Sequence, residues 1–184
     1  ALLVGDALQT QAFITLAHTP VDPATVIALI RTLALASGAA GMAGGQAIDL
    51  LAVGEQLDAA QLEQMHIMKT GALIRASIRM GALAGESLTS PQLEMLDRFG
   101  KTLGLLFQVV DDILDCTAST DMLGKTAGKD AASDKPTYVS LMGLQGARSF
   151  AHELRAQAQQ QTKPLGAQSA RLHDIAQEIV QRTH

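Results

Sequence analysis

Apolar residues recur along most of this chain at the spacing of one helix face, and we find no convincing strand pattern. The pattern predicts a string of helices separated by short polar or glycine-containing breaks. The predicted helices cover residues 1 to about 17, 22–37, 58 to about 78, 90 to about 116, a further helix from 137, 147–161 and 168–181, and Met42, Ile48 and Leu51 keep helical spacing in the stretch between the second and the third. The sequence therefore predicts an all-α protein, and we see neither an internal repeat nor an obvious domain boundary.

Three of the predicted helices begin with recognisable N-terminal signals. Asp22 followed by Pro23 reads as an N-cap with proline at the first helical position. Asp58 with Gln61 resembles a capping box, and Thr137 is expected to cap the helix that follows the long polar loop. These residues satisfy free amide groups at a helix start, so they place the starts of these three helices.

A glycine-rich stretch interrupts the helical pattern early in the chain. Gly38, Gly41, Gly44 and Gly45 fall within it, although the apolar positions on either side keep helical spacing. Because glycine lowers helix stability, its repeated use predicts a bend or a close approach of two backbones.

The composition supports the helical prediction and limits the choice of partners. The 184 residues are 47% hydrophobic but only 3% aromatic, which favours helices packed through small side chains over a β-sheet. The length is enough for one domain with a sizeable core, or for part of a larger one. A net charge of −4 without a stripe of Lys or Arg argues against nucleic acid as a partner.

The sequence shows none of the usual marks of export or membrane insertion. We find no run of about 18 apolar residues that would span a bilayer. Residues 1–17 are interrupted by polar side chains and lack the basic start of a signal peptide. Cys116 is the only cysteine, so no internal disulfide can form, as is usual in a reducing compartment. We therefore expect no membrane span and a cytoplasmic location.

The chain opens in the middle of a helical pattern. Ala1 is neither Met nor an N-capping residue, and Leu2, Leu3 and Leu8 already follow helical spacing. Natural helices usually begin with a residue that satisfies their first free amide groups. We therefore expect this sequence to be truncated at its N-terminus.

The segment around residues 107–115 carries the clearest candidate chemistry. Asp111 and Asp115 are four residues apart and share a helix face with Gln108, so a cation should compensate their repulsion. The apolar flanks indicate a buried helix, and carboxylates at the edge of an apolar cavity suit Mg²⁺. The alternative is a surface acidic turn that makes ordinary salt bridges.

Two further segments offer cations to a phosphate. Lys125, Lys129 and Lys135 follow the aspartates in a glycine-containing loop and would grip a diphosphate held against a metal. An ordinary solvated loop is the alternative. Lys69, beside Thr70 in a mostly apolar helix, would either extend to solvent or reach a phosphate in a cavity. The five histidines show no zinc spacing and no pairing with a nucleophile.

Taken together, these segments resemble the trans-isoprenyl diphosphate synthases, most closely the bacterial farnesyl diphosphate synthases. Any one segment is weak evidence, but the set occurs in family order over nearly the whole chain. The matching segments are Gly5–Thr10, Gly41–Gln46 with Asp49 and Leu50, Lys69–Ile74, Phe107 and Gln108 with Asp111–Asp115, Leu123–Lys125, and Asp134–Tyr138.

The resemblance implies the all-α prenyl synthase fold, with antiparallel helices around a deep central cavity. It implies that Asp111 binds Mg²⁺ directly, with Mn²⁺ as an alternative metal, and that Asp112 and Asp115 assist directly or through water. It further implies that Asp130 lies behind these metal ligands.

The resemblance also assigns residues to the substrates. It implies that Lys69, Lys125 and Lys135 contact an allylic diphosphate, dimethylallyl or geranyl. Thr70 and Gln108 would lie along the allylic chain near the developing carbocation. The expected reaction is condensation with isopentenyl diphosphate to farnesyl diphosphate, and the family implies a homodimer.

One departure from the family pattern bears on activity. Family members carry a first aspartate-rich motif upstream of the segment at Gly5, and this sequence begins too late to include it. Residues 1–184 are thus expected to be the C-terminal part of a single prenyl synthase domain, with little or no turnover as given.

Three other interpretations remain open from the sequence. A non-catalytic partner subunit, or a diphosphate-binding fragment of the same fold, would share these segments. A terpene cyclase would share the ionisation step, but cyclases use many aromatic residues to stabilise cations, and this chain has few. A plain helical interaction protein would not bind diphosphate with magnesium.

Overall fold

A computed structural model of the chain describes residues 2–53, 57–85, 88–123 and 137–182, and all regular elements within these ranges are helical. The all-α prediction is therefore confirmed for the described residues. The helices are α1 (Leu2–Ala17), α2 (Pro23–Ser37), α3 (Met42–Leu51), α4 (Ala59–His66), η1 (Ile67–Gly71), α5 (Ala72–Ala84), α6 (Ser90–Leu123), α7 (Tyr138–Thr162), η2 (Lys163–Ser169) and α8 (Ala170–Gln181).

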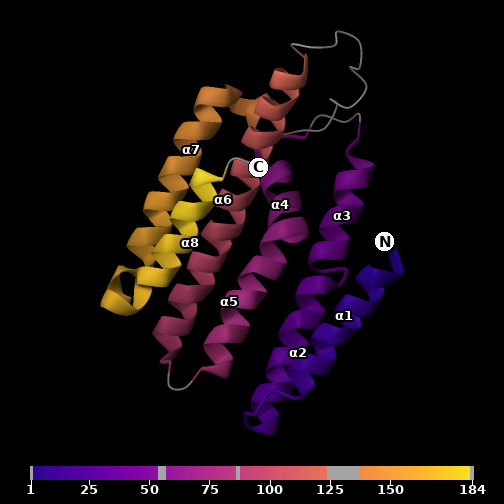
Figure 1. The fold of residues 1–184 in the computed structure, drawn as a ribbon, viewed down its shortest axis with the longest axis vertical. Helices are drawn as coiled ribbons and strands as arrows, with labels where there is room; N and C mark the ends of the chain where they lie inside the picture. Colours follow the sequence, from indigo (N-terminus) through magenta and orange to yellow (C-terminus); the bar gives the residue numbers. More distant parts are fainter. Residues whose placement is uncertain (1, 54–56, 86–87, 124–136, 183–184) are drawn as a thin grey trace.

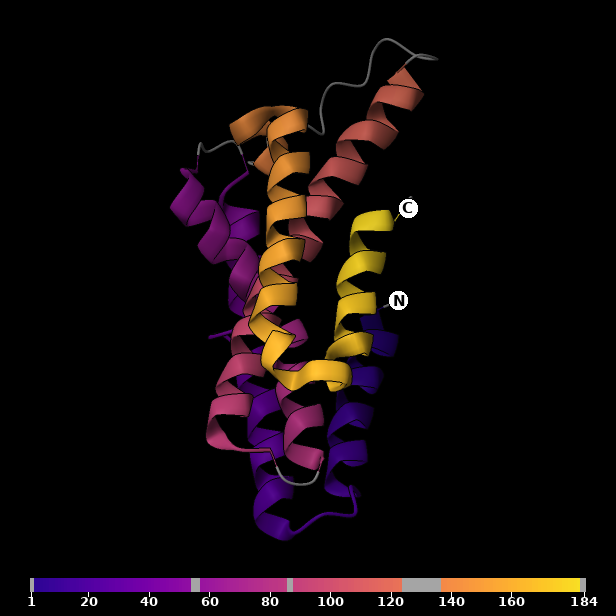
Figure 2. The ribbon, with the colours of Figure 1, turned by 90° about the vertical axis from the view of Figure 1, so that its left-hand side faces the viewer.

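The long helix α6 runs through the middle of the bundle, packed between α5 on one side and α7 and α8 on the other (Figure 1). The helices α7 and α8 lie side by side and are joined through η2 (Figure 2). The core is centred on α6, where Phe99, Leu106 and Val109 are fully buried in a cluster shared with α4, α7 and α8. The helices α1 and α2 lie at the opposite edge, and only α2 packs on α5.

The predicted helix starts are confirmed. The Asp22 carboxylate accepts hydrogen bonds from the backbone amides of Ala24 and Thr25 at 3.0 and 3.1 Å. Asp58 forms the expected reciprocal capping box, and Thr137 forms another at the start of α7. These contacts satisfy amide groups that the helix itself cannot pair.

Two helix boundaries differ from the prediction. The helix α6 continues to Leu123 rather than ending near Cys116, so the aspartate segment lies within the helix and not at its end. The predicted break between the helices from 137 and from 147 falls at Gly143, whose φ of 72° lies in the left-handed region. Glycine is the residue that adopts this conformation without steric strain.

The helix that begins at Asp58 contains a π-helical turn, η1, that the sequence pattern did not indicate. Two glycines bring neighbouring backbones close to it. A Cβ at Gly45 of α3 would lie 2.2 Å from the backbone nitrogen of Lys69. A Cβ at Gly104 of α6 would lie 2.7 Å from the Gly71 Cα. The prediction of close backbone packing in the glycine-rich stretch is therefore confirmed, and η1 is held between α3 and α6.

The stretch Pro23–Leu51, which comprises α2 and α3, is apolar enough by length and composition to cross a membrane. Its mean hydropathy is 1.7 over an 18-residue window, of which 28% is buried within the chain, so our sequence expectation of no such run was wrong. Gly41 has non-helical dihedral angles that interrupt the stretch, and its Asp49 is buried and paired with a lysine. A core helix passes the same test, so the stretch alone is weak evidence for a membrane span.

Candidate active site

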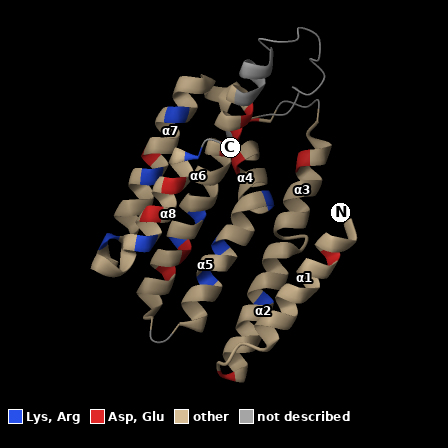
Figure 3. Cartoon of the chain, in the orientation of Figure 1, with Lys and Arg blue, Asp and Glu red and all other residues tan. Residues whose placement is uncertain are grey.

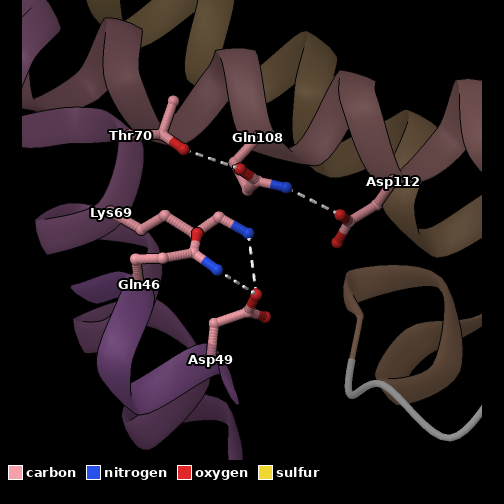
Figure 4. Close-up of polar contacts among 6 residues, drawn as sticks. All are labelled: Gln46, Asp49, Lys69, Thr70, Gln108 and Asp112. Atoms are coloured by element: carbon pink, nitrogen blue, oxygen red, sulfur yellow. Dashed lines mark hydrogen bonds and ion pairs between the residues drawn. The ribbon is translucent and has the colours of Figure 1, made fainter. Parts of the chain in front are cut away.

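A buried ion pair joins α3 to the π-helical turn. The Lys69 ammonium lies 2.9 Å from Asp49 Oδ2, and the Asp49 side chain is only 7% exposed. The Gln46 side-chain amide donates to the same oxygen at 3.5 Å. The contact at Gly45 brings the two backbones together, so Asp49, one helical turn further along α3, can reach the lysine. Asp49 therefore fixes the direction in which Lys69 extends (Figure 4).

A chain of hydrogen bonds runs from the π-helical turn along α6 (Figure 4). The Thr70 hydroxyl donates to Gln108 Oε1 at 3.1 Å, and Gln108 Nε2 donates to Asp112 Oδ1 at 2.9 Å. Asp112 Oδ2 accepts the backbone amide of Tyr138, at the start of α7, at 2.8 Å. Gly104 allows η1 to touch α6 one turn before Gln108, which brings Thr70 within reach of the Gln108 amide.

Asp112 occupies a buried position in this chain. It is 7% exposed, and burial, the largest influence, raises the pKa of its carboxyl group above the ordinary value. Hydrogen bonds from the Tyr138 amide and Gln108 oppose this shift, while Asp111 and Asp115 add to it. The hydrogen bonds to the carboxylate offset part of the loss of hydration.

Asp111 and Asp115 are more exposed to solvent than Asp112. The Asp111 side chain is 42% exposed and lies 3.4 Å from Arg182 Nη2, just beyond the end of α8. The Arg182 guanidinium also lies over the Phe107 ring, 4.5 Å from its centroid. Asp115 is exposed, so the expectation that the whole segment is buried holds only for one side of α6. The expected compensating cation for Asp111 is Arg182.

A second buried titratable group lies next to this network. His66, the last residue of α4, stacks on Tyr138 with ring centroids 5.7 Å apart, and neither ring nitrogen has a hydrogen-bond partner among the described residues. Burial, assisted by the positive charge of Lys69, lowers the pKa of His66 to about 4. Burial raises the pKa of Tyr138, whose hydroxyl likewise has no partner among the described residues.

Comparison with known proteins identifies this arrangement. Residues 1–177 match the family model described as "Polyprenyl synthetase". The chain belongs to the polyprenyl synthetase family. It is 50% identical over 180 residues to a "Probable farnesyl diphosphate synthase" of Bradyrhizobium diazoefficiens, covering 96% of this chain and 54% of that protein. It is 45% identical over 188 residues to the farnesyl diphosphate synthase of Escherichia coli, covering 99% of this chain and 63% of that protein.

Solved structures of related proteins confirm the fold of this chain. The chain aligns with a geranyltransferase of Helicobacter pylori, complexed with magnesium and isoprenyl diphosphate, at a TM-score of 0.77 and 34% identity. The alignment covers 97% of this chain and 57% of that one. The all-α prenyl synthase fold is therefore confirmed, and the chain spans little more than half the length of the relatives it matches.

The fold brings together most of the predicted site residues that the structure describes. Lys69 and Thr70 on η1 face Gln108 on α6, and Asp111 and Asp112 follow on the next turn of α6. Asp115 lies one turn beyond Asp111. Four candidate site residues named from the sequence lie outside the described residues: Lys125, Lys129, Asp130 and Lys135.

Sequence reasoning assigned no role to three groups that the structure adds to the site. Asp49 was part of the resemblance, and an acid in an otherwise apolar helix was the signal that it has a buried partner. Arg182 and the Tyr138 amide come from segments far along the chain. Only tertiary structure places these two beside the aspartates.

The donor set suits a hard divalent cation as part of a larger site. Within the described residues, no three His, Cys, Asp or Glu side chains come together as a metal cluster. Asp111 and Asp115 nevertheless offer two carboxylates on one side of α6, and Mg²⁺ takes one or two carboxylates with waters and substrate phosphates. The residues present therefore fit magnesium.

Two described cavities lie outside the hydrogen bonds of Lys69, Thr70 and Gln108, although Arg182 lines the first of them. One of about 450 Å³ lies among α6, α7 and α8, and one of about 590 Å³ lies between α2 and α5. Lys69, Thr70 and Gln108 line neither of them.

Proposed function

We propose that this chain carries the allylic-diphosphate side of a farnesyl diphosphate synthase site. The proposed reaction condenses an allylic diphosphate, dimethylallyl or geranyl, with isopentenyl diphosphate. The observation that supports this most strongly is the pair of networks that meet at η1, in which Lys69 and Thr70 are held by partners on α3 and α6. The relatives named as farnesyl diphosphate synthases support the choice of substrates.

The proposal gives each described residue a task that its contacts allow. The Lys69 ammonium is already oriented by Asp49 and would bind the diphosphate of the allylic substrate. The hydroxyl oxygen of Thr70 and the carbonyl oxygen of Gln108 would lie beside the positive charge that develops as the C–O bond breaks. Oxygen lone pairs oriented before the reaction stabilise such a charge without reorganisation.

Asp111, with Asp115, would hold the magnesium ion, which when bound neutralises the charge of the leaving diphosphate. The magnesium and isoprenyl diphosphate of the Helicobacter pylori structure support this assignment by similarity. Lys125 and Lys135 remain proposed diphosphate contacts. The further proposals are a cytoplasmic location and a homodimer associated through the apolar side of α1 to α3.

Magnesium-dependent binding of geranyl S-thiolodiphosphate, an unreactive analogue, tests the proposed function directly. Calorimetric titration should show binding that depends on Mg²⁺, because the metal and the diphosphate share the site. The Asp111→Asn variant should weaken this binding by about tenfold or more. Asp174→Asn, an exposed aspartate in the first half of α8, is the matched control and should bind like the wild type.

The outcome separates the enzyme from its alternatives. Absence of magnesium-dependent binding in the wild type would favour a plain helical interaction protein. Analogue binding without formation of a C15 product from geranyl and isopentenyl diphosphates would favour a non-catalytic subunit or a binding fragment.

A further inference from the structure

Asp112 differs from the aspartates on either side of it in what its carboxylate touches. Both of its oxygens accept hydrogen bonds inside the protein, Oδ1 from Gln108 Nε2 and Oδ2 from the backbone amide of Tyr138. Asp111, by contrast, is 42% exposed. A buried carboxylate with both oxygens engaged is poorly placed to bind a metal ion as well. Its role should therefore be sought in the groups that it holds.

The Asp112 carboxylate determines which group donates and which accepts in two side-chain hydrogen bonds, the one between Thr70 and Gln108 and the one between Gln108 and Asp112. An ionised carboxylate only accepts, so the Gln108 amide must turn its NH₂ group toward Asp112. The Gln108 carbonyl oxygen then faces Thr70, whose hydroxyl must donate its hydrogen to that oxygen. The remaining lone pairs of both oxygens are left for a third group. If the amide turned over, Thr70 would accept from NH₂ and direct its hydrogen elsewhere.

The start of α7 secures this arrangement. The Tyr138 amide belongs to the first turn of α7, where backbone N–H groups have no partner within the helix. A negative charge is favoured there by the helix dipole, so the position stabilises the ionised, accept-only form of Asp112. One carboxylate thus connects the start of α7 to the amide orientation on α6.

We propose that Asp112 is a positioning residue that sets the hydrogen-bond polarity of Gln108 and Thr70, and is not a magnesium ligand. Its consequence for the reaction, which rests on the proposed function, is that both polar side chains present oxygen to the developing allylic cation. The reversed amide would present hydrogen atoms and repel that charge.

The Asp112→Asn variant reverses this polarity by design. An asparagine satisfies the Tyr138 amide only with its oxygen, which leaves its NH₂ group facing Gln108. Gln108 must then turn its oxygen toward residue 112 and its NH₂ group toward Thr70. The variant keeps the shape of the side chain, removes its negative charge and reverses the direction of the hydrogen bonds at Gln108 and Thr70.

The experiment compares two ligands, each titrated with Mg²⁺. One is an aza analogue of geranyl diphosphate with a protonated nitrogen in place of C3, and the other is geranyl S-thiolodiphosphate, whose chain is neutral. In Asp112→Asn the protonated analogue should lose about tenfold or more in affinity, because hydrogen bonds to charged groups are strong. The neutral analogue and the Mg²⁺ affinity should change by less than about twofold. Equal weakening of both ligands, or a loss of Mg²⁺ affinity as large as in Asp111→Asn, would overturn the proposal.

A second measurement needs neither ligand nor a folded Asp112 variant. The NMR signal of the Gln108 side-chain NH₂ group, assigned by its disappearance in Gln108→Met, reports the hydrogen bond to Asp112. Adding Mg²⁺ to the wild type should leave that signal in place, since a positioning residue keeps its partner. Loss of the hydrogen-bonded signal on Mg²⁺ binding, with the position of an unbonded side-chain amide taking its place, would show that Asp112 has left Gln108 for the metal and would overturn the proposal. This arm gives an answer even if the wild type binds neither analogue, which would contradict the proposed function alone.

Discussion

His66 is buried with no hydrogen-bond partner for its ring nitrogens among the described residues, and this makes the stability of the protein depend on pH. The folded pKa of about 4 lies below the ordinary value of 6.5, so the unfolded chain takes up a proton first as the pH falls. Stability should therefore be complete above pH 6.5 and should fall between 6.5 and 4, by about 3 kcal/mol for this group alone. Urea unfolding at several pH values measures this decline.

Replacement of the histidine identifies its share of the decline. His66→Phe keeps an aromatic ring against Tyr138 and cannot be protonated. In this variant most of the loss of about 3 kcal/mol in unfolding free energy between pH 6.5 and 4 should therefore disappear. His152→Gln, which changes an exposed histidine on α7, should leave the decline as it is in the wild type. An equally steep decline in His66→Phe would contradict the assignment.

At the scale of residues, the sequence identified the acidic and basic groups of the site but not which way each side chain points or which group it contacts. The four-residue spacing of Asp111 and Asp115 required a compensating cation, and Arg182 supplies it for Asp111. The spacing could not tell that Asp112 turns inward, because that depends on the start of α7, which approaches α6 from a distant part of the chain. Tertiary packing alone makes Asp112 buried while Asp111 and Asp115 remain accessible to solvent.

At the scale of elements, the site depends on how closely α3 and α6 approach η1. A Cβ at Gly45 would meet the Lys69 backbone nitrogen at 2.2 Å, so Gly45→Ala must push α3 away from η1. We expect a loss of about 1–3 kcal/mol in the free energy of unfolding, the usual effect of overpacking, measured by urea unfolding. The binding of geranyl S-thiolodiphosphate should also weaken, because Asp49 moves with α3.

Gly81→Ala is the matched control for that substitution. A Cβ at Gly81 in α5 would meet no atom within 4 Å, and alanine is the better helix former. This variant should therefore be as stable as the wild type or more stable by up to about 1 kcal/mol. If Gly45→Ala behaved like Gly81→Ala, the close contact between α3 and η1 would be disproved.

Most helices could be predicted because their causes are local. The caps at Asp22, Asp58 and Thr137 lie within the few residues that set a helix start. The π-helical turn was not predictable in this way, since its residues read as ordinary helix and its neighbours Gly45 and Gly104 belong to other helices. The glycines were visible in the sequence, but not the backbone that each of them faces.

At the scale of the whole molecule, charge is unevenly distributed. The charged residues gather on α4 to α8, whereas α1 to α3 are almost free of them (Figure 3). Large apolar side chains are nevertheless exposed on these first three helices: Leu2, Leu3, Val4, Leu8, Ile14, Ile27, Leu35, Ile48, Leu50 and Leu51. An apolar surface of this extent usually marks an interface, and the proposed homodimer would cover it.

Leu8→Glu tests that association. Leu8 is 65% exposed on α1, so a glutamate there would be tolerated in a monomer but would be buried without a partner in an interface. Light scattering with size exclusion should show a dimer for the wild type and a monomer for the variant. Ile175→Glu, at a 45% exposed position on α8, should remain dimeric. A monomeric wild type, or one that partitions into lipid vesicles, would contradict the proposal.

The π-helical turn also affects how the length of this segment can change during evolution. A π-helix uses wider hydrogen-bonded loops than an α-helix, so Ile67–Gly71 accommodates an additional residue within one turn. Deleting a single residue there would allow a regular α-helical turn to form and would leave α5 in nearly the same rotation relative to α4, whereas a deletion from a regular α-helix rotates everything that follows by about 100°. The face of α5 that packs on α6 would therefore still point toward it. We expect that relatives one residue shorter in η1 keep this packing, whereas relatives with a one-residue gap inside α5 do not.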